Sequence, residues 1–259
     1  MLRGPLRPTP FLLLRAHQIL KSPPASAAKQ PPHPATSNLP TRTPTPTAPG
    51  KTVLEVERKF PALAVPSLSP AHCRGYAPAF GSVTALPARR IHDVYYDTAS
   101  HALCAAGTWV RLRDGRWEAK LRRGGDFVNS RFEELAREDD ITRCVRAILG
   151  DARPPREKFG LRVMAEFTTT REAWLCDGEF RVVRDRMDFG HEVGEVELQV
   201  AVDGLMGEGW KEREMERMDA RIAGFMERYR WAFDCSRGEA KGKLTAWFEM
   251  VEKDKNKER

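Results

Sequence analysis

Charged and apolar residues alternate along Val53–Phe60, which reads V-L-E-V-E-R-K-F. Side chains of a β-strand point to opposite faces with a period of two residues. One face of this segment therefore carries Glu55, Glu57 and Lys59, and the other carries Arg58 with the apolar residues. The pattern predicts a strand with one charged face and one largely apolar face.

The same division into two faces recurs in four later segments, at 109–113, 117–122, 180–185 and 195–200. Their polar faces carry Trp109, Arg111 and Arg113; Glu118, Lys120 and Arg122; Arg181 and Asp185; and Glu195, Glu197 and Gln199. Asp114-Gly115 lies between the first two segments and predicts a hairpin turn. Burying an unpaired ion is costly, so these faces must either look out to water or converge on a polar, water-filled interior.

The remaining segments complete a mixed pattern of strands and helices. Further strands are predicted at 92–97, 127–135, 161–169 and 173–175, and a helix is predicted over about 139–149. Apolar residues at i+3/i+4 spacing predict a helix over Glu208–Arg230 with a Met-rich buried stripe, and Leu244–Val251 predicts a short final helix. We expect an α+β fold: an antiparallel β-barrel with a hydrophilic interior and helices packed outside.

The first 51 residues differ in composition from the rest of the chain. They contain no Asp or Glu, and their seven Lys and Arg residues equal the net charge of +7 of all 259 residues. We expect residues 1–51 to be a disordered, basic, Pro-rich extension, residues 52–252 a catalytic domain and residues 253–259 a charged tail. The arginines around Phe11–Leu14 resemble a mitochondrial transit peptide, so we expect a cytoplasmic or mitochondrial protein.

Charge and cysteine usage narrow the classes of function. Residues 52–259 balance 36 basic against 36 acidic residues, so the high pI comes from the extension and does not indicate nucleic-acid binding. No window reaches the ~18 apolar residues that a membrane span needs. The five cysteines form no C-x-x-C, which suits a reducing compartment and argues against a zinc site. We expect a monomer that binds neither nucleic acid nor membrane.

Two carboxylates and a lysine on one strand face suit a hard metal ion together with an anionic substrate. Carboxylates are ligands of Mg²⁺ and Mn²⁺, and an ammonium group binds phosphate. For Val53–Phe60 taken alone, a solvent-exposed charged face is the alternative. The chain contains no G-x-x-x-x-G-K-[ST], which argues against a P-loop enzyme. It also contains no H-E-x-x-H and no G-x-S-x-G, the motifs of zinc metalloproteases and of hydrolases with a serine nucleophile elbow.

Six segments carry a family resemblance in chain order. They are V-L-E-V-E-R-K-F at 53–60, D-V-Y-Y-D-T at 93–98, W-V-R-L-R-D-G-R-W-E-A-K at 109–120, F-T-T-T-R-E-A-W at 167–174, D-R-M-D-F-G-H-E-V-G-E-V-E-L at 185–198 and A-K-G-K-L at 240–244. Together they resemble the CYTH family, the triphosphate tunnel metalloenzymes. The resemblance implies a barrel whose charged interior binds a triphosphate.

The resemblance also implies roles for particular residues. The candidate ligands of Mg²⁺, or of Mn²⁺, are Glu55, Glu57, Asp185, Glu195 and Glu197. Val183 stands where relatives carry another acid, on the same face as Asp185. The candidate catalytic, phosphate-binding residues are Lys59, Arg111, Arg113 and Lys120. Further substrate-binding candidates are Arg171, Lys243, which its K-L register favours over Lys241, and Trp109, whose ring could stack on a cationic ring; Arg181 is a weaker candidate.

The implied activity is metal-dependent hydrolysis of a triphosphate, with thiamine triphosphate as the leading substrate and thiamine diphosphate and phosphate as products. Inorganic tripolyphosphate or nucleoside triphosphates are the alternative substrates for the same tunnel, ahead of adenylyl cyclase or RNA 5′-triphosphatase activity. A non-enzymatic polyphosphate-binding module is the alternative of a different class. The two E-x-E pairs argue against it, because a site for anions alone would not favour so many acids.

Overall fold

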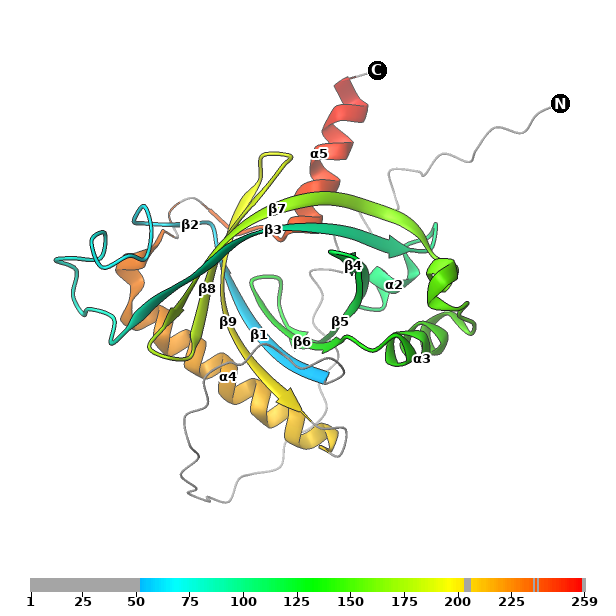
Figure 1. The fold of residues 1–259 in the computed structure, drawn as a ribbon, viewed down its shortest axis with the longest axis horizontal. Coiled ribbons are helices and arrows are strands. Elements are labelled where there is room, and N and C mark those ends of the chain that lie inside the picture. Colours follow the sequence, from blue (N-terminus) through cyan, green and yellow to red (C-terminus); the bar gives the residue numbers. More distant parts are fainter. Residues whose placement is uncertain (1–51, 203–205, 235, 237, 258–259) are drawn as a thin grey trace.

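The computed structural model describes residues 52–202, 206–234, 236 and 238–257. Its main feature is a closed barrel of antiparallel strands in the order β1-β6-β5-β4-β3-β7-β8-β9 (Figure 1). The strands are β1 (Thr52–Phe60), β3 (Val83–Asp97), β4 (Thr108–Arg113), β5 (Arg116–Gly125), β6 (Asn129–Leu135), β7 (Arg162–Cys176), β8 (Phe180–Met187) and β9 (Glu192–Val202). Two short strands, β2 (Ala62–Leu63) and β10 (Phe233–Asp234), pair separately.

The helices lie outside the barrel, as predicted (Figure 1). They are α2 (Ala102–Ala105), α3 (Glu138–Leu149), α4 (Glu208–Arg228) and α5 (Lys243–Lys257), with 3₁₀ turns η1 (Pro155–Gly160) and η2 (Arg230–Ala232). Helix α4 runs along β1 and β9, while α3 lies beside β5. Within the described ranges, none of these helices is both long and apolar enough to cross a membrane.

The apolar face of β1 packs outward against α4. Leu54, Val56 and Phe60 are at most 1% exposed, and they share a core cluster with Met218 and Ile222 of α4. Burying a side chain of this kind stabilises the fold by roughly 1.5–3 kcal/mol. The alternation in Val53–Phe60 and the Met-rich stripe of α4 are therefore both confirmed, and the charged face of β1 must point inward.

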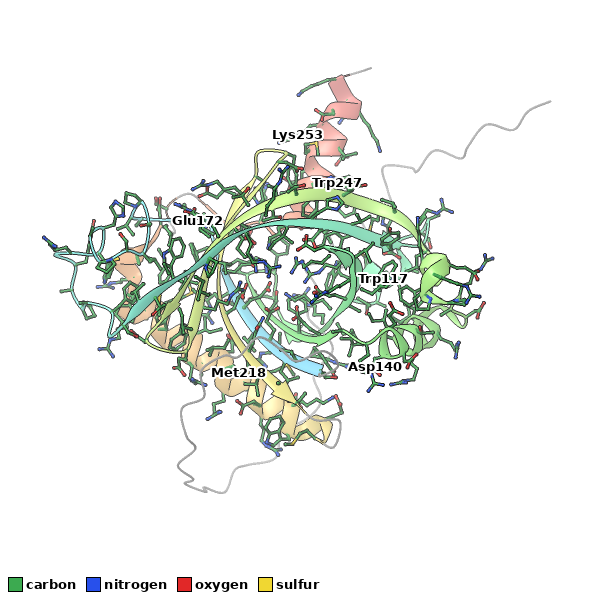
Figure 2. All side chains as sticks on the ribbon, viewed as in Figure 1. Trp117, Asp140, Glu172, Met218, Trp247 and Lys253 are labelled. Atoms are coloured by element: carbon green, nitrogen blue, oxygen red, sulfur yellow. The ribbon has the colours of Figure 1, made fainter. Side chains whose placement is uncertain are left out.

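Two further apolar clusters lie elsewhere around the barrel. Val110 of β4 and Ala119 of β5 pack on Ile141 and Val145 of α3. A third cluster lies near the start of α5 and includes Trp247. Figure 2 shows Met218, Trp117 and Trp247, which belong to the three clusters, on three sides of the barrel. The first two clusters cover outer faces of the barrel, whereas the third includes Tyr95, which lines the barrel cavity, and packs near the start of α5.

Two close contacts fix β1 in place. Asp219 of α4 accepts hydrogen bonds from Arg58 of β1 and Arg131 of β6, each over 3.0 Å. Gly194 of β9 stands opposite Phe60, and a Cβ atom built on it would lie only 2.0 Å from the Phe60 ring. The seams on both sides of β1 therefore depend on specific residues.

Several boundaries differ from the sequence-based expectation. Strand β3 begins at Val83 rather than at 92, and it tolerates Pro87 because the pairing register with β7 shifts between Leu86 and Arg89. The expected strands at 161–169 and 173–175 form one strand, β7. Helix α5 continues to Lys257, into the stretch expected to be a charged tail. The expected extension at 1–51 lies outside the described residues, and the domain limits remain a prediction.

Candidate active site

Four glutamates from β1 and β9 form what we call the acidic wall of the barrel interior: Glu55, Glu57, Glu195 and Glu197. Each is at most 4% exposed. Glu57 stands directly across from Glu197, Lys59 across from Glu195, and Glu55 across from Gln199. Like charges placed opposite one another destabilise a strand pair. The wall therefore requires cationic partners from other strands.

Lys120 of β5 supplies one such partner. Its Nζ lies 2.8 Å from Oε2 of Glu57 and 3.7 Å from Oε1 of Glu134, and it also contacts Glu55. Lys59 contacts the other oxygen of Glu57. One lysine thus joins three carboxylates from two strands.

A second group of ion pairs surrounds Asp185 of β8, which is fully buried. Arg171 of β7 donates two hydrogen bonds to its carboxylate, over 2.7 and 2.6 Å. Nζ of Lys243, at the start of α5, lies 2.8 Å from Asp185 and 3.2 Å from Glu195. Lys241 instead pairs with Glu249 of α5. The structure thus brings Lys243, and not Lys241, to the acids.

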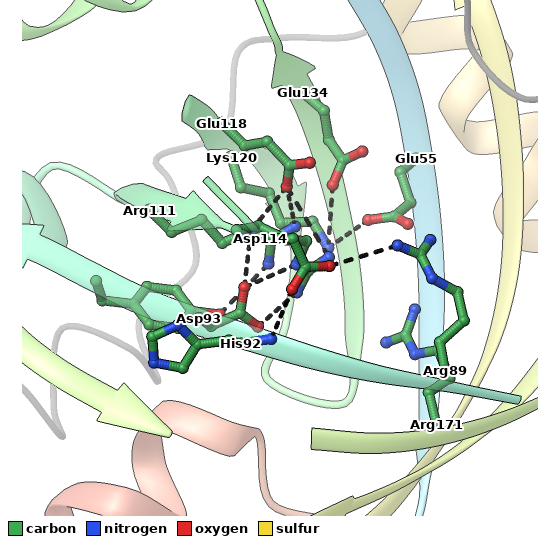
Figure 3. Close-up of polar contacts among 12 residues, drawn as sticks. Glu55, Arg89, His92, Asp93, Arg111, Asp114, Glu118, Lys120, Glu134 and Arg171 are labelled. Carbon is green, nitrogen blue, oxygen red and sulfur yellow. Dashed lines mark hydrogen bonds and ion pairs between the residues drawn. The ribbon is translucent and has the colours of Figure 1, made fainter. Parts of the chain in front are cut away.

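A third group lies on β3, β4 and β5 (Figure 3). Arg113 donates to both oxygens of Asp93 over 2.7 Å, and Arg111 donates to Glu118 over 2.9 Å. Nε of Arg111 is also 3.9 Å from Asp93. The two arginines are therefore held side by side by carboxylates of neighbouring strands.

A cavity of about 380 Å³ opens onto these charges. Lys59, Arg111, Lys120 and Lys243 line it together with Glu57 and Glu195. One part of its lining is apolar and comes from Trp109, Phe127, Phe132, Leu244 and Phe248. Trp109 meets Phe132 edge to face, with ring centroids 5.7 Å apart. The cavity is large enough for a small organic ligand, and it joins a cationic region to an aromatic one.

Burial and pairing push the pKa values of two neighbouring acids apart. Burial alone would raise the pKa of Glu55, but the Lys120 ammonium lowers it to about 2. Burial, with the Glu55 charge nearby, raises the pKa of Glu134 to about 7. Lys120 stays charged, because its acidic neighbours outweigh its own burial and raise its pKa well above the usual value.

The acids of β9 are divided in the same way. Burial would raise the pKa of Glu195, but Lys243 and Lys59 hold it well below the usual value. For Glu197, burial outweighs the attraction of Arg181 and Arg171, so its pKa is raised. A cation entering between these acids would favour the ionised form of both.

The five proposed metal ligands offer only carboxylate oxygens, which is the donor set that Mg²⁺ and Mn²⁺ prefer. Oε2 of Glu55 forms an ion pair with Lys120 and is otherwise buried. The residue chemistry therefore fits a hard cation. In the part of the chain that the structure describes, no three His, Cys, Asp or Glu side chains converge on a point that could hold a metal ion. The carboxylates are turned toward Lys and Arg instead.

The candidates from sequence lie around one interior, although single-strand patterns missed some of their partners. Arg181 contacts Glu197 there, and Val183 is fully buried on the same face of β8 as Asp185. The missed residues are Asp93, Tyr95 and Glu134, whereas Gln199 was already placed on the polar face of its strand. Asp93 and Tyr95 alternate within D-V-Y-Y-D, so the period-two rule could have placed them on one face. Gln199 donates to Glu55 over 2.7 Å and extends the polar face of β9.

Comparisons with known proteins found relatives by sequence and by structure. Human thiamine-triphosphatase is 32% identical over 126 residues, which cover 42% of this chain and 55% of the human protein. The chain thus matches little more than half the length of that relative. Among solved structures, the PH1819 protein of Pyrococcus horikoshii OT3 is 14% identical with a TM-score of 0.42, over 75% of this chain and 98% of its own. HpAC1 of Hippeastrum, described as having a dominant triphosphatase activity, is 17% identical with a TM-score of 0.41, over 76% and 95%.

The family model of the CYTH domain matches residues 54–224. That range begins in β1 and ends within α4, so it takes in every strand of the barrel. It also contains the acidic wall, Asp185 and the interior arginines. The chain belongs to the CYTH domain family.

Proposed function

We propose that this protein hydrolyses thiamine triphosphate to thiamine diphosphate and phosphate inside the barrel, with Mg²⁺ or Mn²⁺ bound. The observation that carries the proposal is a cavity in which lysines and arginines, carboxylates and aromatic rings meet. The similarity of 42% of this chain to human thiamine-triphosphatase supports the same choice of substrate.

The basic side chains would bind and orient the phosphates. Arginine binds phosphate oxygens through two parallel hydrogen bonds, and lysine acts as a point charge. Lys59, Arg111, Arg113 and Lys120 would hold the phosphoryl group that is transferred and neutralise the charge that develops on it. Arg171 and Lys243 would hold the remaining phosphates. Lys120, Arg171 and Lys243 now pair with carboxylates of the proposed metal site, so the substrate must exchange those contacts for its own.

The carboxylates would serve the metal. Glu55, Glu57, Asp185, Glu195 and Glu197 supply oxygen ligands, and a bound divalent cation polarises the phosphoryl group and lowers the pKa of bound water. Lysines held near these acids would then turn to the substrate phosphates. When metal and triphosphate bind together, the carboxylates would therefore bind the metal, and the basic side chains would bind the phosphates.

Selection of thiamine would depend on the aromatic part of the cavity. Trp109 and Phe132 present ring faces and edges beside the cationic region. A cationic thiazolium ring stacked on Trp109 would gain about 2 kcal/mol if desolvated. Inorganic tripolyphosphate has no such group and would use the phosphate ligands alone. It is therefore the second candidate substrate, with nucleoside triphosphates beside it.

A substrate panel at one fixed Mg²⁺ concentration tests the proposal. Purified protein should show a higher kcat/KM for thiamine triphosphate than for tripolyphosphate or ATP. If tripolyphosphate is the better substrate, the thiamine assignment fails and the general triphosphatase takes its place. Binding of tripolyphosphate without turnover of any triphosphate would instead favour a polyphosphate-binding module.

A further inference from the structure

Strand β3 places two polar side chains opposite the two arginines of β4. The Cα partners across the β3–β4 pair are Asp93 with Arg113 and Tyr95 with Arg111. Each β3 side chain also bonds the arginine that faces it: Asp93 accepts from Nε and Nη2 of Arg113, and the Tyr95 hydroxyl accepts from Nη1 of Arg111 over 3.3 Å. The same strand therefore supports both arginines.

The contact between Asp93 and Arg113 is buried and involves two parallel hydrogen bonds. The Asp93 side chain is fully buried, whereas that of Arg113 is 18% exposed. The guanidinium edge formed by Nε and Nη2 thus faces the protein, and the other terminal nitrogen, Nη1, stays on the side of Glu118 at 3.9 Å. An arginine held along one edge has little freedom to rotate, and it presents its remaining donors in one direction.

Asp93 also acts on charges beyond Arg113. Burial by itself would raise its pKa, but Arg113, Arg111 and Lys243 together lower it, so the carboxylate is ionised at neutral pH. A buried carboxylate that is ionised keeps the neighbouring guanidinium groups close to it.

We propose that β3 positions the phosphate-binding arginines of this enzyme, with Asp93 holding Arg113 and Tyr95 holding Arg111 in the orientation that a triphosphate requires. Neither residue is assigned a chemical step. The inference rests on the proposed triphosphatase function. It adds Asp93 and Tyr95 as the residues that fix the orientation of Arg113 and Arg111.

Strand β3 also contains a matched control. Asp97 lies on the same face of the strand and is likewise fully buried. Its oxygens accept hydrogen bonds from the backbone N–H groups of Leu103 and Cys104, each over 2.9 Å, and so cap the short helix α2. Asp97→Asn therefore removes a buried carboxylate of equal burial that supports backbone rather than an arginine.

The test compares Asp93→Asn with Asp97→Asn, using tripolyphosphate and Mg²⁺. We expect Asp93→Asn to lower kcat/KM by about 10–100-fold, the usual effect of removing a group that orients a ligand-binding residue. Asp97→Asn should lower Tm but keep kcat/KM within about threefold, because the arginines keep their partners. Equal losses in both variants, or no loss in Asp93→Asn, would overturn the proposal.

A double-mutant cycle separates positioning from a general structural role. If Asp93 acts through Arg113, then Asp93→Asn should have almost no further effect in an Arg113→Lys background, whereas additive losses would refute the link. Tyr95→Phe is a second test variant, which removes the hydroxyl group but keeps the aromatic ring packed. It should lower kcat/KM by about fivefold, the net effect of one hydrogen bond. The loss should be smaller in an Arg111→Lys background. If Asp93→Asn does not fold, an unchanged Tyr95→Phe variant overturns the proposal.

Failure of the proposed function would be visible separately. If the wild-type protein hydrolyses no triphosphate, the enzymatic assignment fails. Calorimetric binding of tripolyphosphate with Mg²⁺ to the wild type and to Asp93→Asn then still tests the positioning. Equal affinities for the two proteins would refute it, and weaker binding by the variant would support it.

Discussion

Nζ of Lys120 on β5 lies 2.8 Å from Oε2 of Glu57 on β1, although β6 separates these two strands in the barrel. The side chains therefore meet across an intervening strand, which requires a narrow interior. A lysine proposed to bind phosphate and an acid proposed to bind metal are therefore partners of one another in this structure. Each would be released when its own ligand arrives, so we expect metal and triphosphate to bind cooperatively.

Removal of divalent metal should abolish turnover. Buried carboxylates lie beside Lys120, Lys243 and Arg113 in the interior, and a triphosphate alone would face their repulsion. Activity on tripolyphosphate should disappear in excess EDTA and return when Mg²⁺ or Mn²⁺ is restored. Full activity in EDTA would contradict the metal-dependent mechanism.

Glu57→Gln should stop turnover while the barrel stays folded. Gln keeps the shape of the side chain but removes the charge that a cation requires, so kcat should fall by at least about 100-fold. Glu133→Gln is the matched control. Glu133 is almost as buried, but it lies on the opposite face of β6 from Glu134 and pairs with Arg123 and Lys211. Loss of activity in both variants would show that the effect is not specific to the acidic wall, because replacing a buried glutamate elsewhere has the same result.

Trp109→Ala should change substrate choice. The loss of one desolvated cation–π contact corresponds to about 2 kcal/mol, or roughly thirtyfold in kcat/KM for thiamine triphosphate. Tripolyphosphate turnover should remain nearly unchanged, because that substrate has no ring. Equal losses for both substrates would mean that Trp109 is needed for packing against Phe132 instead.

The stability of the metal-free protein should fall as pH rises through the range in which Glu134 ionises. Its pKa is raised from 4.5 to about 7, so the folded protein keeps a proton that the unfolded chain releases. Stability must then decrease between about pH 4.5 and about pH 7. Glu55 acts in the opposite direction: its pKa is lowered to about 2, so its contribution is present above about 4.5 and is lost on acidification.

Thermal unfolding in EDTA measures this effect. The decrease in Tm between about pH 5 and about pH 7.5 should be smaller in Glu134→Gln than in the wild type, because the amide does not titrate. An identical decrease in the two proteins would assign the titration to another group.

Gly194→Ala should destabilise the seam between β1 and β9. The added methyl group would lie 2.0 Å from the ring of Phe60, which is 1% exposed and has little room to move. Overpacking of this kind costs about 1–3 kcal/mol or more. Gly224→Ala in α4 is the control. Nothing lies within 4 Å of its Cβ position, so the substitution should raise Tm slightly. A Gly194→Ala protein as stable as the wild type would show that Phe60 can shift.

The sequence was sufficient to predict the strands whose two faces differ clearly in polarity. The alternation in β1, β4 and β5 predicted which side chains share a face, and the stripe of α4 predicted its buried face. Strand β3 was predicted only over its last residues, because Pro87 and two exposed arginines interrupt the alternation of apolar and polar residues in its first half. Its continuation depends on pairing with β7, which local propensity does not reveal.

The partners within the site could not be predicted from alternation alone. That Lys120 joins Glu55, Glu57 and Glu134 depends on which strands are neighbours and on their register. Asp93 belongs to a motif noted in the sequence, yet nothing in the motif indicates that Arg113 stands opposite. A strand's own pattern gives the face of a residue but not its neighbour across the sheet.

Because β1 packs against α4 on one face and supplies the acidic wall on the other, the chain tolerates length changes very unevenly. One residue inserted between Leu54 and Phe60 would exchange the two faces beyond it, placing carboxylates under Met218 and apolar groups in the cavity. An insertion at Gly115 would fall in a hairpin turn with open space around it. A peptide tag or reporter loop should therefore be better tolerated at Gly115 than within β1, because an insertion in a turn does not exchange the two faces of a strand.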